Sequence, residues 1–187
     1  MTGSAGLKVL AVAGSLRRGS YNHQLAVAAA SLAPPGMTIT VFDDLASVPL
    51  FNEDAEADGG PAGVRDLRAA VAASDALIIA TPEYNQSLPG VTKNLVDWLS
   101  RGDEAVLDGK PVAIMGATRG PWGTRLSQSV LRHTLGACNA LVMPTPQVYV
   151  RGVAELFDAD GALIDDRTRA TLTKFLAAFA LWIAKVG

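Results

Sequence analysis

The chain has 187 residues, a formal net charge of −2 and a single cysteine, Cys138. The near-neutral charge gives no sign of the basic footprint of a nucleic-acid-binding protein, and one cysteine excludes an internal disulfide framework. A chain of this length can bury its own core, so we expect one domain over residues 1–187.

Location and partners are also limited by composition. Met1–Gly6 lacks the charged start and long apolar core of a signal peptide, and no apolar run is long enough to cross a membrane. We therefore expect a cytoplasmic protein without a membrane or nucleic-acid partner. The acidic segment Phe51–Gly63, which contains Gly and Pro, is predicted to be a surface loop.

Apolar runs alternate with helical patterns along the chain. The predicted strands are Leu7–Ala13, Met37–Phe42, Ala76–Thr81, Pro111–Ala117 and Ala140–Met143. The predicted helices are Tyr21–Leu32, Gly63–Ala73, Leu88–Ser100, Thr124–Leu135 and Asp166–Val186. Short, almost continuously apolar strands are typical of a parallel sheet covered on both faces. The pattern predicts an α/β fold, a doubly wound sandwich with a five-stranded parallel sheet. Ligands of such sheets bind beyond the carboxyl ends of the strands, so the loops after the first, third and fourth strands are the candidate site.

The loop Gly14–Asn22 joins the first strand to the first helix. The first amides of a helix lack acceptors, and the helix dipole favours negative charge there. Side-chain donors suited to a phosphate lie in the same loop: Ser15, Ser20, Asn22, and Arg17 or Arg18. The loop matches neither the P-loop nor the dinucleotide pattern, and it suits a monophosphate. The alternative is a plain polar turn in which Ser20 or Asn22 caps the helix.

The loop after the third strand is stiffened by Pro82 and Pro89. Tyr84 offers an aromatic face and Asn85 an amide, which together suit a flat heteroaromatic ring. The alternatives are that Glu83 caps a helix and that Tyr84 packs on a neighbouring loop.

The loop after the fourth strand contains three glycines, Gly116, Gly120 and Gly123, which let the backbone approach a ligand closely. Trp122 lies either against a bound ring or over the loop itself.

Residues for independent catalysis are missing. His23 and His133 lie on separate predicted helices without ligand-spaced neighbours, so no metal site is predicted. No nucleophile–base arrangement stands out and no catalytic residue is assigned. A site with phosphate and ring contacts but no acid, base or nucleophile indicates a cofactor.

Two motifs resemble the NADPH-dependent FMN reductase family, a flavodoxin-like group that includes chromate and quinone reductases. They are G-S-L-R-x-G-S-x-N at 14–22 and T-P-E-Y-N-x-S-x-P-G-x-x-K-N-x-x-D-W at 81–98. The resemblance implies FMN as a non-covalent cofactor and NADPH or NADH as electron donor. The acceptors it implies are small molecules: quinones, azo compounds, metal oxyanions or free flavin.

The resemblance also implies roles for particular residues. Those matching the phosphate site are Ser15, Arg17, Ser20 and Asn22. Those matching the ring-binding loop are Pro82, Glu83, Tyr84 and Asn85. The glycine-rich segment along the other side of the flavin includes Thr118, Gly120 and Gly123.

One departure from the family pattern follows the fourth strand. Many relatives have Gly-Gly and then, two residues later, Arg, where this chain has Gly123, Thr124 and Leu126. Whether Arg125 takes the role of that arginine stays open, as do the choice between NADPH and NADH and the range of acceptors.

The resemblance further implies a homodimer or homotetramer with flavin sites near the subunit interface. Leu95, Trp98 and Leu99 on the helix Leu88–Ser100 suit such a contact. The alternative is that Trp98 packs inward on the sheet. Two other functions compete with an enzyme: an FMN-binding electron carrier without turnover, and a binding module that has lost its cofactor. Arg17 and the small net charge argue against the carrier.

Overall fold

The computed structural model describes residues 6–102 and 105–187; the predicted absence of a leader at Met1–Gly6 falls mostly outside them. The strands are β1 (Leu7–Ala13), β2 (Met37–Phe42), β3 (Ala76–Ala80), β4 (Pro111–Thr118), β5 (Leu141–Val142) and β6 (Val148–Arg151). The helices are α1 (Tyr21–Ser31), α2 (Glu53–Ala57), α3 (Ala62–Ala72), α4 (Gly90–Leu99), α5 (Arg125–Ala137) and α6 (Asp166–Val186). Two 3₁₀ helices are η1 (Leu45–Ser47) and η2 (Val153–Glu155). No helix in these ranges is both long and apolar enough to cross a bilayer.

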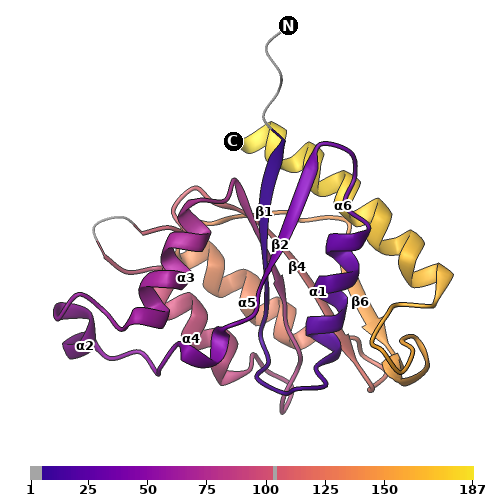
Figure 1. Cartoon of the computed structure of the whole chain (residues 1–187), viewed down its shortest axis with the longest axis horizontal. Coiled ribbons are helices and arrows are strands. Elements are labelled where there is room, and N and C mark those ends of the chain that lie inside the picture. The colour runs from indigo at the N-terminus through magenta and orange to yellow at the C-terminus, as the bar shows by residue number, and fades with distance from the viewer. Residues whose placement is uncertain (1–5, 103–104) are drawn as a thin grey trace, which may run out of the picture.

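The sheet is parallel, with the order β2-β1-β3-β4-β5 and with β6 also paired to β4. The chain moves from β1 outward to β2, then returns across β1 to β3, so the order reverses beside β1. The carboxyl ends of the strands and their loops lie at the lower edge of the molecule in Figure 1. A reversal of this kind places a crevice at that edge.

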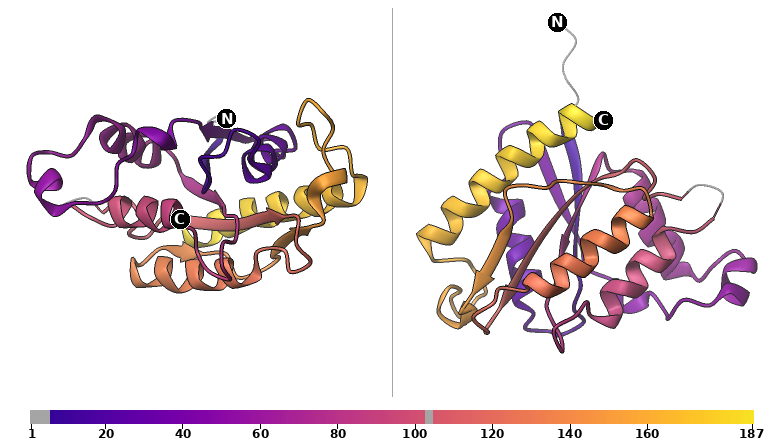
Figure 2. Two further views of the ribbon diagram at one scale, coloured as in Figure 1. Left: turned by 90° about the horizontal axis from the view of Figure 1, so that it is seen from below. Right: turned by 180° about the vertical axis from the view of Figure 1, so that it is seen from behind.

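Helices cover both faces of the sheet, as predicted. Helices α1 and α6 pack on one face, and α3, α4 and α5 pack on the other (Figures 1 and 2). Alternate residues of a strand point to opposite faces, so Val9 and Ala11 of β1 join the first core while Leu10 and Val12 join the second. All five residues of β3 are buried. The α/β flavodoxin-like fold is therefore confirmed.

The fifth position of the sheet is shared by two short strands. Pro111 and Val112 at the start of β4 pair with β5, and Met115–Thr118 pair with β6. Pro144 and Pro146 lie in the interruption, where they supply no N–H donor. The sequence predicted only Ala140–Met143 here and missed β6, whose alternation of buried Val148 and Val150 with less buried neighbours is a strand signal only four residues long.

The segment Phe51–Gly63 is not only a loop. It contains α2, whose three acidic residues in the first turn favour a helix N-terminus, and Asn52 caps this helix by accepting the Asp54 N–H at 2.9 Å. The prediction of an irregular loop was wrong because a five-residue helix is too short to show a periodicity.

Trp98 packs inward. Its side chain is 1% exposed, its ring meets Phe51 edge-on at 4.9 Å between centroids, and its Nε1–H donates to the Pro49 carbonyl at 2.8 Å. Leu95 and Leu99 are fully buried as well. The proposed subunit contact through these three side chains is therefore wrong, because the chain buries them in its own core.

Candidate active site

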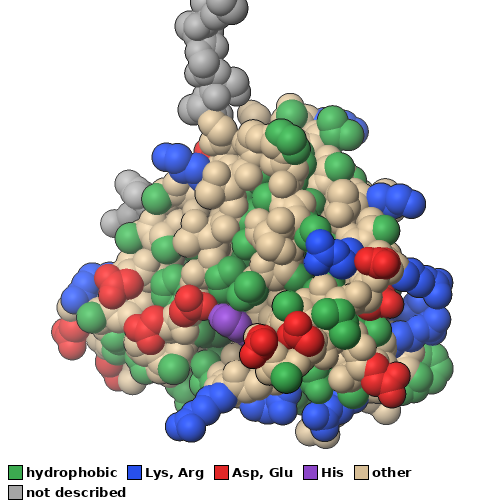
Figure 3. Space-filling model, turned by 45° about the vertical axis from the view of Figure 1, so that its right-hand side comes forward, with side chains coloured by type: hydrophobic (Ala, Val, Ile, Leu, Met, Phe, Trp, Pro, Cys, Tyr) green, Lys and Arg blue, Asp and Glu red, His purple; other side chains and the backbone are tan. Residues whose placement is uncertain are grey.

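A cavity of about 210 Å³ lies at the carboxyl edge of the sheet, between the loops after β1, β3 and β4. Basic side chains gather along this lower edge in the space-filling view (Figure 3). The cavity brings together eight residues predicted to bind the cofactor: Ser15, Arg17, Ser20, Asn22, Pro82, Glu83, Tyr84 and Thr118. Asn85, Gly120 and Gly123 do not line it.

The start of α1 forms one wall. Ser20 is the N-cap, and its Oγ accepts the His23 N–H at 3.4 Å. The Gln24 N–H bonds to the Ser20 carbonyl at 3.0 Å, as the first turn of a helix requires. The N–H groups of Tyr21 and Asn22 lie too early in the helix to have an acceptor within it, so they are donors for an anion.

Two guanidinium groups converge on Tyr21 at the same wall. Arg17 lies 5.7 Å from the centre of the Tyr21 ring and donates to the Gly19 carbonyl at 2.5 Å, and Arg119 lies 5.5 Å from the ring. Arg119 also donates to the Tyr21 hydroxyl at 3.3 Å. The structure thus places Arg17 rather than Arg18 in this cavity. Tyr21 and Arg119 were missed by the sequence analysis, although Arg119 follows the end of β4 directly.

Asn22 has a different role from the one predicted for its side chain. The side chain is buried, its Nδ2 donates to the Ala117 carbonyl at 3.0 Å, and its Oδ1 accepts the Ala117 N–H at 2.9 Å. Both ends of the amide are therefore occupied by the end of β4. The Asn22 side chain fixes α1 against β4, and only its backbone N–H remains for a ligand.

Glu83 caps α5. Its Oε2 accepts the N–H groups of Leu126 at 2.9 Å and Ser127 at 3.1 Å. The N-cap of α5, Thr124, forms no capping bond, and its Oγ1 accepts instead from the Gln128 side-chain amide at 3.0 Å. A carboxylate from the loop after β3 therefore supplies the missing cap, the alternative given above for Glu83.

Tyr84 and Asn85 belong to a tight hairpin turn. The Tyr84 N–H donates to the Ser87 carbonyl at 3.3 Å, and the Ser87 N–H donates to the Tyr84 carbonyl at 3.0 Å. Asn85 and Gln86 have φ values of 50° and 60°, as the two central residues of such a turn require, and Asn tolerates this conformation. Tyr84 is left half exposed at the rim of the cavity.

Of the three residues predicted to bind the cofactor in the loop after β4, only Thr118 lines the cavity. Thr118 accepts the Gly120 N–H at 3.2 Å, while a Cβ at Gly120 would make only an ordinary contact, 3.7 Å from the Thr118 Oγ1. Gly123 has a φ of 69°, and a Cβ there would lie 2.8 Å from the Tyr149 Cβ. Gly123 is therefore required by packing against β6.

The donor set fits the phosphate end of FMN. Unpaired helix amides, the Ser15 hydroxyl and two guanidinium groups surround one small cavity, while the Glu83 carboxylate is turned to α5. The volume is below the roughly 300–1,000 Å³ of whole small-molecule sites, so it accounts for one end of a larger ligand. Across the described residues, no three His, Cys, Asp or Glu side chains lie where they could hold a metal ion.

A doubly wound sheet with this anion site at its switch point defines a flavodoxin-like protein. The family model of the NADPH-dependent FMN reductases matches residues 7–155, and the chain belongs to this family. The predictions of an oxidoreductase class, of FMN as cofactor and of NAD(P)H as donor are thereby confirmed.

Curated relatives match over almost their whole length. An NAD(P)H-dependent FMN reductase of Pseudomonas aeruginosa is 43% identical over 96% of this chain and 97% of its own. A 2-hydroxy-1,4-benzoquinone reductase of a Burkholderia species is 40% identical over 95% of this chain and 96% of its own length. The quinone reductase of Escherichia coli K12 is 37% identical over 96% of this chain and 97% of its own length.

A solved structure agrees with the fold. FerB, a flavoenzyme NAD(P)H:acceptor oxidoreductase of Paracoccus denitrificans, superposes with a TM-score of 0.88 at 35% identity, covering 97% of this chain and 99% of its own.

Proposed function

We propose that the chain acts as one domain that oxidises NAD(P)H and reduces quinones, with azo compounds, metal oxyanions and free flavin as further acceptors. The cavity at the start of α1 carries this proposal, because its donors suit the FMN phosphate. The names of the relatives support quinones as the first acceptor to test.

FMN supplies a ring that accepts and returns electrons, and the residues of the chain position it. The N–H groups at the start of α1, the Ser15 hydroxyl and Arg17 would hold the phosphate. Pro82, Tyr84 and Thr118, which line the cavity, and Asn85 in the hairpin turn beside it would orient the ring. Orientation of the reacting partners is the contribution that such a site makes to the rate.

Replacement of Arg17 tests the phosphate site. A charge-assisted bond to phosphate is worth roughly 1.5–3 kcal/mol, so Arg17→Ala should weaken FMN binding about tenfold to a hundredfold. The purified protein should be yellow and hold about one FMN per chain, measured by its visible spectrum after flavin release. Arg18→Ala is the matched control, because Arg18 does not line this cavity. Unchanged affinity in Arg17→Ala would contradict the assignment.

Steady-state kinetics test the reaction. NADPH oxidation with a quinone should give parallel initial-rate lines, since donor and acceptor use the same open side of the cavity in turn. Intersecting lines would establish a ternary complex and contradict this order. Bound FMN without any turnover would favour the electron carrier instead.

A homodimer or homotetramer remains part of the proposal on a new basis. Leu126 and Val130 are 47% and 41% exposed, one turn apart on α5, beside the loop that carries Tyr84. Val130→Glu should lower the association measured by sedimentation velocity. Leu181→Glu is the control, because Leu181 is 74% exposed on α6. A wild-type monomer at micromolar concentration with full activity would contradict the oligomer and leave the flavin site standing.

A further inference from the structure

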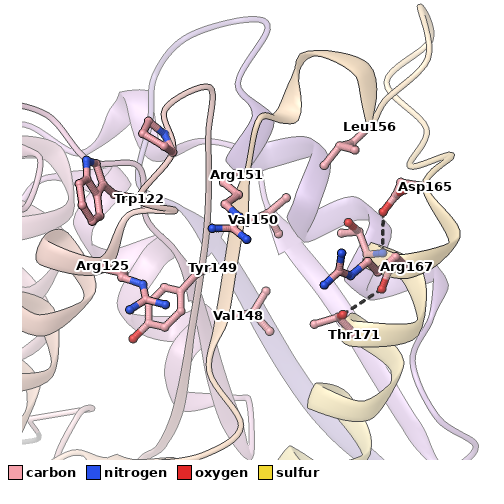
Figure 4. Close-up of a pocket in the computed structure, with 12 residues that line it drawn as sticks. Trp122, Arg125, Val148, Tyr149, Val150, Arg151, Leu156, Asp165, Arg167 and Thr171 are labelled. Carbon is pink, nitrogen blue, oxygen red and sulfur yellow. Dashed lines mark hydrogen bonds between the residues drawn. The ribbon is translucent and has the colours of Figure 1, made fainter.

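A second and larger cavity, about 710 Å³, lies beside β6 and shares no lining residue with the first. Its floor is β6, with Val148 and Val150; one wall is the loop that carries Trp122, and the other is the start of α6 (Figure 4). We call this space the β6 groove. None of the roles described above for the chain uses it.

Three guanidinium groups line the β6 groove. Arg125 begins α5, Arg151 ends β6 and Arg167 lies in the first turn of α6, so the charges come from three separate elements (Figure 4). Within residues 6–102 and 105–187, none of them forms an ion pair. The groove therefore gathers three guanidinium charges, none of which is held in a close ion pair within these ranges.

Asp165 is the one carboxylate among the described residues that line the groove. Its Oδ2 accepts the Thr168 N–H at 2.7 Å, because Asp165 is the N-cap of α6 (Figure 4). Its carboxylate caps the start of its own helix, which stabilises α6, and it also interacts electrostatically with Arg167. An anion entering the groove would be attracted by the three arginines.

The groove also offers aromatic surface. Trp122 is 71% exposed, and Tyr149 lies under Arg125, whose guanidinium carbon is 5.0 Å from the ring centre. Figure 4 shows Trp122 and the Arg125–Tyr149 pair on the wall opposite Arg167. A flat base can stack on such a surface while its phosphate meets an arginine fork.

One loop separates the groove from the first cavity. Ala117, Thr118 and Arg119 line the first cavity, and Trp122 and Arg125 line the groove. A ligand with a reactive ring at one end and a phosphorylated nucleoside at the other can therefore use both spaces.

We propose that the β6 groove holds the adenosine 2′-phosphate end of NADPH, with Arg151 and Arg167 binding the phosphate. This inference rests on the proposed function, because NADPH must be the donor at the first cavity. NADH lacks this phosphate, so the same two arginines would set the preference for NADPH.

Binding of a fragment tests the groove without turnover. Calorimetry on the FMN-loaded protein should show adenosine 2′,5′-bisphosphate binding about tenfold or more tighter than adenosine 5′-monophosphate, since one charge-assisted phosphate contact suffices for that ratio. Arg151→Ala and Arg167→Ala should each remove most of this difference. Both side chains are exposed, so the variants should fold. Lys174→Ala is the matched control, because it removes one positive charge from α6 outside the groove.

Kinetics supply the second measurement. In Arg151→Ala and Arg167→Ala the KM for NADPH should rise about tenfold, while kcat and the KM for NADH stay unchanged, because only binding common to ground and transition state is lost. Equal binding of the two probes by the wild type, or an unaltered ratio of the two KM values in both variants, would overturn the proposal. A double variant that changes the sedimentation of the protein would overturn it too, by showing a subunit contact.

The proposed function is checked separately by the flavin content. Both variants should keep about one FMN per chain, because neither arginine lines the first cavity. A wild-type protein that binds no FMN would refute the proposed function, while the same bisphosphate titration on the FMN-free protein would still decide whether the groove binds a 2′-phosphate.

Discussion

Glu83 links the loop after β3 to the start of α5, and its replacement separates a structural role from contact with flavin. Glu83→Ala removes a carboxylate that accepts two N–H bonds. Loss of a helix cap costs about 0.5–2 kcal/mol, and loss of a negative charge at a helix start costs about 0.3–1 kcal/mol. The free energy of unfolding should therefore fall by about 1–3 kcal/mol.

Glu83→Gln keeps an oxygen acceptor and loses only the charge. Its cost should stay near the smaller value, about 0.3–1 kcal/mol. The assay is urea unfolding of the FMN-free protein, followed by circular dichroism. In thermal unfolding of a chain of this size, the same loss of about 1–3 kcal/mol in Glu83→Ala should lower Tm by roughly 2–12 °C.

Glu155→Ala is the control, because within the described residues this exposed carboxylate has no hydrogen bond. A Glu83→Ala urea midpoint equal to that of wild type would refute the capping role. If Glu83→Gln loses FMN affinity at unchanged stability, the carboxylate contacts the flavin.

Three further changes test other contacts. Asn22→Leu leaves the N–H and carbonyl of Ala117 without partners and should lower the free energy of unfolding by about 2–4 kcal/mol, measured in urea; a loss within 0.5 kcal/mol would contradict the clamp. Gly14→Ala places a Cβ 2.0 Å from the Thr92 Oγ1, so it should cost about 1–3 kcal/mol, and Thr92→Ala in the same chain should recover part of that. Hydrogen bonding at the start of α6 lowers the pKa of Asp165, so its stabilisation is complete above the unfolded-state pKa and is lost as pH falls through the folded-state pKa. The urea midpoints of wild type and Asp165→Ala should differ at pH 7 and converge as the pH falls through the lowered folded-state pKa; a difference that stays constant across the acid range would contradict this.

The fold followed from the sequence because its signals are local and repeated. Apolar runs predicted β1 and β2 with the bounds that the structure shows, and the pattern of α6 did the same. The split of the fifth sheet position into β5 and β6 could not be predicted, because it depends on pairing with β4 across a break that contains two prolines.

The sequence predicted well which loops meet at the candidate site. It predicted less well which side chains in those loops are free to contact a ligand. Eight residues meet at one cavity because parallel strands bring their following loops to one edge. Which polar atoms remain free there is decided by tertiary neighbours. The Asn22 side chain is hydrogen-bonded to the backbone of Ala117, and the Glu83 carboxylate accepts from the first N–H groups of α5. Both partners lie far away in the sequence, so the sequence did not reveal them.

The divided fifth position of the sheet has a consequence for behaviour at high concentration. A long, straight outer strand offers a row of unpaired amides and carbonyls on which another molecule can extend the sheet. Here the outer edge is two residues of β5 and four of β6, separated by a segment with Pro144 and Pro146. Neither piece is long enough to template a foreign strand, so this border of the sheet should resist the cross-β assembly that leads to fibrils.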